Sequence, residues 1–202
     1  MRDCPPVKIF TVAGNRDIGN FVARQMSWTG FEKQFMEPFY YFQFGERYYI
    51  FLDTQCYKLD FDYGPKMRKK QDEWLELLFR TLPRDAPKTV VMHTALFLEF
   101  PEEKKAKKKL KSLPLDVSTW LTELFSYNSV DTVFSGHVHF ENFPEPVDNV
   151  RQVIMTSINA LNTWHSDDTN IDYGPEFGNN ERGYYVVQIK DANKPAVQKI
   201  KV

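Results

Sequence analysis

Short apolar runs separated by an amphipathic segment are the feature that most constrains the fold of this chain. The runs at residues 7–13, 88–92 and 130–135 have the length and composition of buried strands. Between them, residues 66–82 carry apolar side chains at helical spacing, and Pro83 ends that helix. Strands that alternate with helices are typical of a sheet packed against helices, so the order predicts an α/β or α+β arrangement.

The rest of the chain adds hairpins and short elements to this pattern. Aromatic runs at residues 39–44 and 47–53 flank Gly45-Glu46 and predict a β-hairpin. The same criteria predict a loose helix within 20–37, a helix over 116–127 with Asp116 as its N-cap, and strands at 150–157, 183–189 and 196–201. We see no internal repeat or linker, so residues 1–202 are expected to form one domain.

Composition excludes several classes of partner. The formal net charge of -1 provides no basic field that would attract nucleic acid. No apolar run approaches the length of about 18 residues that a membrane span needs, and the apolar stretch near the N-terminus is too short for a signal peptide. The 2 cysteines are too few for a disulfide framework. We therefore expect a cytoplasmic protein that binds neither nucleic acid nor membrane.

Three polar clusters each follow an apolar strand directly. They are residues 14–17 with the sequence GNRD, the single residue His93, and residues 136–139 with the sequence GHVH. Ligands bind at the carboxyl ends of strands in open α/β sheets, so the three clusters can meet at one place. Imidazole nitrogens together with amide or carboxylate oxygens are a suitable ligand set for a metal ion.

The spacing of His137 and His139 raises a geometric question. His137 and His139 are two residues apart, and strand geometry would fix the directions of their side chains. A chain that is leaving the sheet need not keep that geometry. A bend at Gly136 would let the two imidazoles reach separate ions about 3.5–4 Å apart, as in two-metal sites.

These residues resemble the third, fourth and fifth motifs of the calcineurin-like metallophosphoesterase family. The similar stretches are AGNRDIGN, FLDTQCY, QDEWLELLF, MHTALFLE and VFSGHVH, and they are also similar to a family member described as a serine/threonine protein phosphatase. The resemblance implies a metallophosphoesterase-type α/β sandwich of mixed sheets with flanking helices. It also implies hydrolysis of phosphate monoesters, in a phosphoprotein or a small phosphoester.

By this resemblance, Asn15, His93 and His137 would bind one divalent ion and His139 would bind a second. Mn, Fe, Zn and Mg are not distinguishable from the sequence. The family's first two motifs, which supply further Asp and His ligands, are absent from this chain, so we expect its first strand–helix unit to be missing. Neutral ligands alone do not offset the charge of a divalent ion, and reduced occupancy is therefore expected.

Arg16 departs from the family pattern, in which a histidine precedes the acidic residue. An arginine keeps its proton and cannot serve as a general acid, but it binds phosphoryl oxygens strongly. Asp17 would orient the side chain at position 16, or would simply form the turn after Gly14-Asn15. Slowed hydrolysis with retained phosphate affinity is the expectation.

Three functions remain open from the sequence: a metal-dependent phosphoesterase, a catalytically inactive pseudo-phosphatase that binds phosphate or protein, and a fragment without function. Other polar features have both a structural and a functional interpretation. They are the lysine run 104–111 (solvated face or docking patch), His165 with Asp167 and Asp168 (exposed loop or mouth of the site), and Gln55 with Cys56 (core or cleft).

Overall fold

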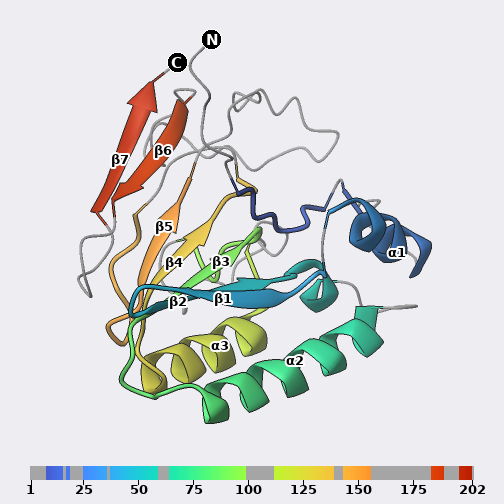
Figure 1. Ribbon diagram of the computed structural model, residues 1–202, viewed down its shortest axis with the longest axis horizontal. Coiled ribbons are helices and arrows are strands. Elements are labelled where there is room, and N and C mark those ends of the chain that lie inside the picture. Colours follow the sequence, from blue (N-terminus) through green and yellow to red (C-terminus); the bar gives the residue numbers. More distant parts are fainter. Residues whose placement is uncertain are drawn as a thin grey trace.

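The computed structural model describes residues 8–15, 17–18, 25–35, 37–58, 64–98, 112–138, 143–155, 183–188 and 196–201. Its centre is a five-stranded mixed sheet with the strand order β1-β2-β3-β4-β5 (Figure 1). The strands are β1 (Tyr40–Phe44), β2 (Arg47–Leu52), β3 (Lys88–Met92), β4 (Val130–Ser135) and β5 (Arg151–Ile154). Strand β1 is antiparallel to β2, and β2 to β5 run parallel to one another.

A second, two-stranded sheet pairs β6 (Gly183–Gln188) with β7 (Ala196–Lys201) in antiparallel fashion. The described helices are α1 (Gln25–Gln34), α2 (Gly64–Thr81) and α3 (Leu115–Tyr127), and a 3₁₀ turn, η2 (Gln55–Tyr57), follows β2. The observed architecture is thus an α/β fold.

The core lies between the large sheet and the pair of helices α2 and α3, which run side by side along one of its faces (Figure 1). Strands contribute Ile50 and Val90, each 0% exposed, and the helices contribute Leu75 and Leu121, also 0% exposed. Full burial of such a side chain contributes about 1.5–3 kcal/mol. The apolar stripe of α2 that the sequence predicts is therefore the stripe that covers the sheet.

The hairpin of β1 and β2 forms as predicted around Gly45-Glu46. Gly45 has a positive φ of 59°, a conformation that glycine adopts without steric cost. Aromatic rings then stack across the two strands, with 4.6 Å between the ring centroids of Tyr40 and Phe51. Phe10, from the preceding segment, stacks on Phe42 at 4.2 Å. The aromatic residues of this region are thus largely structural.

The amino-terminal edge of the sheet is held by a buried ion pair. Asp131 is an extra residue of β4, since its neighbours Val130 and Thr132 pair with the adjacent residues Lys88 and Thr89 of β3. The Nη1 and Nη2 atoms of Arg47 each donate to the Asp131 carboxylate at 2.9 Å, and Arg47 is only 1% exposed. This bidentate pair joins β2 to β4 across β3.

Lys88 fixes the turn between α2 and β3 at the same edge. Its Nζ donates to the carbonyl oxygens of Pro83, Arg84 and Ala86 at 2.8, 3.0 and 2.8 Å. Burial lowers the pKa of Lys88 to about 8. The ammonium thus donates to three carbonyls of the turn that follows α2.

Two of the expected elements differ in the structure. Residues 8–14 form no strand with the described part of the sheet, and Ile9 is 77% exposed. This segment instead contacts the hairpin, because the Tyr40 hydroxyl accepts from the Thr11 amide and donates to the Thr11 carbonyl, both at 2.8 Å. Asp116 lies in the first turn of α3, and Pro114 takes the N-cap position. The lysine run 104–111 lies outside the described residues.

We expect Asp131→Ala to destabilise the protein by about 3 kcal/mol, because it leaves the buried Arg47 guanidinium without its carboxylate. The double variant Arg47→Met with Asp131→Leu should lose less, since no charge is then left buried. Urea unfolding measures both, with Asp85→Ala as the control because Asp85 is 97% exposed. An equal loss in the single and double variants would contradict this account.

Candidate functional site

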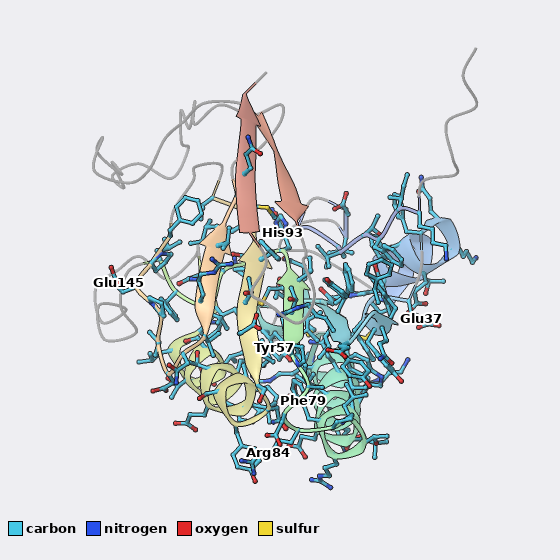
Figure 2. All side chains as sticks on the ribbon, turned by 60° about the vertical axis from the view of Figure 1, so that its left-hand side comes forward. Glu37, Tyr57, Phe79, Arg84, His93 and Glu145 are labelled. Carbon is cyan, nitrogen blue, oxygen red and sulfur yellow. The ribbon has the colours of Figure 1, made fainter. Side chains whose placement is uncertain are left out.

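The carboxyl ends of the parallel strands β2, β3 and β4 meet at one edge of the sheet, and polar residues follow each of them. Asp53 follows β2, His93 follows β3, and Gly136-His137 follows β4. His93 lies near the upper end of the central strands in Figure 2, whereas Arg84 lies at the bottom of the view, by the helices. The three strand ends thus supply side chains to one region, as the sequence predicts.

Three donor atoms converge at this edge. His93 Nε2 lies 3.0 Å from Asn15 Oδ1 and 3.0 Å from His137 Nδ1. The two imidazole rings meet edge to face, with 4.9 Å between their centroids and 67° between their planes. Asn15, His93 and His137 are separated by 78 and 44 positions in sequence, so it is the fold that brings them together.

The backbone after β4 turns sharply to present His137. The Gly136 amide donates to the His93 carbonyl at 3.0 Å, which continues the pairing of β3 with β4 by one residue. The Val138 amide then donates to the Gly136 carbonyl at 2.9 Å, so His137 is the central residue of a three-residue turn with φ 71°. The bend expected at Gly136 is therefore made by His137 itself.

A tight turn holds Asn15. The Asp17 amide donates to the Gly14 carbonyl at 3.1 Å, and the Gly14 amide donates to the Asp17 carboxylate at 2.8 Å. A Cβ at Gly14 would lie 3.0 Å from His93 Cε1 and 3.0 Å from Asp17 Oδ2. Gly14 is thus needed for the close approach of His93, and Asp17 has the turn-forming role that the sequence allowed.

With the Asn15 amide in this orientation, the two short contacts of His93 Nε2 cannot both be separate two-centre hydrogen bonds. His93 Nε2 carries at most one proton, and Asn15 Oδ1 only accepts. If His93 Nε2 accepts a proton from His137 Nδ1, its lone pair also faces the oxygen of Asn15 at 3.0 Å. If His93 Nε2 donates, one proton must serve two acceptors. A cation bonded to the three atoms would remove this conflict.

The separations between these atoms agree with shared coordination. Two ligands about 2.1 Å from one ion lie about 3.0 Å apart in octahedral and about 3.4 Å apart in tetrahedral geometry. Asn15 Oδ1 and His137 Nδ1 each lie 3.0 Å from His93 Nε2. Within the described part of the chain, no group of three or more His, Cys, Asp or Glu side chains could hold an ion.

Lys58 is a neighbour of the site that the sequence analysis missed. Its Nζ lies 3.3 Å from His137 Nε2, on the ring nitrogen that does not face His93. The residue follows η2, and its amide donates to the Gln55 carbonyl at 3.0 Å. Burial lowers the pKa of Lys58 to about 8. Its position directly after the FLDTQCY strand end was the available sequence signal.

Asp53, also missed from the sequence, is a buried residue near this edge that forms hydrogen bonds with several elements. Its carboxylate accepts from Trp28 Nε1 at 2.5 Å and from the Gln55 amide at 2.8 Å, and its own amide donates to Gln71 Oε1 at 2.8 Å. These bonds tie α1, η2 and α2 to the end of β2. Burial raises the pKa of Asp53 to about 6, while the bonds from Trp28 and Gln55 oppose the shift.

Several expected site residues lie outside the described residues. They are Arg16, His139, His165, Asp167 and Asp168. Cys56 is described and is 1% exposed within the hydrophobic core, which agrees with its packing interpretation. Gln55 is 3% exposed and lies within 3.5 Å of the Thr54 and Thr94 hydroxyls, so it is a buried polar contact.

No family model and no curated protein matches the sequence of this chain. Similar solved structures include one described as GAP50, the anchor in the inner membrane complex of Plasmodium, with a TM-score of 0.49 and 17% identity. The match covers 73% of this chain and 48% of that one, so this chain spans about half of its length. Across the described residues, no helix combines the length and apolar character that a membrane crossing requires.

Gly14→Ala should displace the His93 ring, because the added Cβ would lie 3.0 Å from His93 Cε1, and any affinity of the site for Mn²⁺ should fall about tenfold with it. Gly136→Ala is the matched control, since its Cβ would meet only the Met155 carbonyl at 3.9 Å. Calorimetric titration with Mn²⁺ gives the affinities, and histidine ring signals in NMR spectra report the displacement without any metal. Equal effects of the two alanines would count against this role of Gly14.

The pKa of Asp53 predicts how stability depends on pH. Its folded pKa of about 6 lies above the ordinary 3.8, so the unfolded chain loses this proton first as pH rises. Stability should therefore fall by up to about 3 kcal/mol between pH 4 and 6 and then level off. Urea unfolding at pH 4.5 and 6.5 should show a smaller difference for Asp53→Asn than for the wild type or the exposed control Asp85→Asn. The same pH dependence in all three proteins would rule out Asp53 as the source.

Proposed function

We propose that this chain is a metal-dependent phosphoesterase of the calcineurin-like type, acting on phosphate monoesters in a phosphoprotein or a small molecule. The observation that carries the proposal is the convergence of Asn15 Oδ1, His93 Nε2 and His137 Nδ1 with separations of 3.0 Å. A ligand set of one amide oxygen and two imidazole nitrogens suits a divalent ion. The resemblance of the sequence to this family supports the same assignment, as does the location at the carboxyl edge of the sheet.

The residues of the site would act in distinct ways. Asn15, His93 and His137 would hold one ion, and His139 would hold a second. A bound divalent ion would supply Lewis acidity and an activated water. The turn closed by Gly14 and Asp17 fixes Asn15 before any ligand arrives. Arg16 would bind the phosphoryl oxygens, and because it keeps its proton it would not protonate the leaving group.

The charge of the donor set bears on occupancy. Asn15, His93 and His137 contribute no negative charge, and the two nearby described carboxylates are already engaged. Asp17 Oδ2 accepts from the Gly14 amide at 2.8 Å, and Asp53 is 0% exposed with both oxygens accepting hydrogen bonds. Hard divalent ions prefer anionic oxygen, so we propose weak occupancy for this donor set, with Mn, Fe, Zn and Mg all as candidate ions.

The same observation favours a second candidate, a catalytically inactive pseudo-phosphatase that binds phosphate or protein. Without a carboxylate ligand, the donors would hold a metal too weakly to sustain turnover, while cationic side chains at the site could still bind phosphate. For both candidate functions we propose a cytoplasmic location. This proposal rests on cysteine usage and not on the site.

Hydrolysis of p-nitrophenyl phosphate separates these candidates. A phosphoesterase should show Mn²⁺-dependent hydrolysis that His137→Ala lowers by more than about 100-fold, since loss of a ligand should exceed the roughly 10–100-fold cost typical of outer-shell partners. Lys66→Ala, at an exposed position of α2, is the control and should keep full activity. Binding of a phosphopeptide without turnover in Mn²⁺ would favour the pseudo-phosphatase instead.

A further inference from the structure

Lys58 is the described cation that lies against the site, and it has no counterpart in the motifs discussed above. From its position we propose that Lys58 binds the phosphate group of the ligand as it meets Asn15, His93 and His137. The inference rests on the proposed phosphate chemistry of the site. It makes Lys58 a residue that contributes to affinity for phosphate, and not a metal ligand.

The position of the ammonium fits this role. Lys58 Nζ lies 3.3 Å from His137 Nε2, while Nδ1 of the same ring lies 3.0 Å from His93 Nε2. The ammonium is thus separated from the converging donor atoms by the width of one imidazole ring. A tetrahedral phosphate directs its oxygens in several directions, so one oxygen can face the donor atoms while another faces Lys58.

The backbone beneath Lys58 is fixed, whereas its side chain has a flexible stem. The Lys58 amide is bonded to the Gln55 carbonyl, and the Gln55 amide is bonded to the buried Asp53. The preceding Tyr57 is 2% exposed, and its hydroxyl donates to Asp72 at 2.8 Å. Four methylene groups then allow the ammonium to move from His137 to an incoming anion without a change in the fold.

Charge at the site favours an anion. The three converging side chains are uncharged or cationic, and Lys58 adds a positive charge beside them. A phosphate monoester carries a charge of about −1.5 to −2 at pH 7, and hydrogen bonds between charged groups are stronger than neutral ones. Metal-binding histidines usually direct their second nitrogen to a carboxylate or carbonyl. Lys58 lies beside His137 Nε2 at 3.3 Å, and its positive charge would attract a negatively charged ligand.

The other buried cations of the described chain cannot take this role. Arg47 is 1% exposed and bonded to Asp131, and Lys88 is 0% exposed and bonded to three carbonyls. Both residues begin their strands, β2 and β3, and so lie at the opposite edge of the sheet from His93.

Binding of inorganic phosphate tests the inference without requiring turnover. Calorimetry on the full 202-residue chain in Mn²⁺ should give a Kd for phosphate about tenfold higher for Lys58→Met than for the wild type. Lys58→Arg should restore binding to within about threefold, because it keeps the charge. Lys66→Met, the same substitution at an exposed position of α2, should leave the Kd unchanged. Mn²⁺ affinity, titrated separately, should change by less than about threefold in every variant.

The outcomes distinguish this inference from the proposed function. Phosphate binding that depends on Lys58 in a chain that does not hydrolyse esters would support the inference and remove the enzymatic proposal. Mn²⁺-dependent hydrolysis with a phosphate Kd insensitive to Lys58→Met would support the enzymatic proposal and overturn the role of Lys58. Failure of the wild type to bind phosphate, or a loss of Mn²⁺ affinity equal to the loss of phosphate affinity, would overturn the role of Lys58. Lys58→Gln, which also removes the charge, replaces Lys58→Met in this test if the latter does not fold.

Discussion

Parallel pairing of β2, β3 and β4 is the constraint on which the rest of the structure depends. It sends three strand ends to the same edge of the sheet, so residues far apart in sequence become neighbours there. The opposite edge is held by the Arg47–Asp131 ion pair, which spans β3 and is made possible by the extra residue in β4. The register fixed at one edge therefore determines where His93 and His137 stand at the other.

Much of this arrangement could be predicted from the sequence, because the strands that matter are short apolar runs followed at once by polar residues. The hairpin, α2, β3 and β4 lie within a few residues of their predicted positions. The proximity of His93 and His137 follows from the parallel pairing of β3 with β4, whereas Asn15 reaches His93 from a segment that forms no strand. The prediction of a strand at residues 7–13 was wrong for the described residues of that segment. Strand formation requires a hydrogen-bonding neighbour, and an apolar run does not reveal whether one is present.

Asp53 and Lys58 were missed in the sequence for a different reason, although both lie in or directly after the stretch FLDTQCY. Each is a single polar residue near an apolar run, and its meaning comes from distant partners. Asp53 is defined by Trp28 and Gln71, which lie 25 and 18 positions away, and Lys58 by His137, 79 positions away. Such contacts are products of tertiary packing, and neither periodicity nor a local motif records them. The residues Arg16 and His139 remain predictions from the sequence.

The turn at His137 links stability to function in this fold. A residue with a side chain rarely adopts a φ of 71°, and holding one there costs roughly 1–3 kcal/mol. Glycine would adopt the same backbone freely, yet it would remove the imidazole that meets both His93 and Lys58. Selection for stability alone would therefore drive this position toward glycine, and the histidine marks a place where the chain retains a less stable backbone in order to keep a side chain.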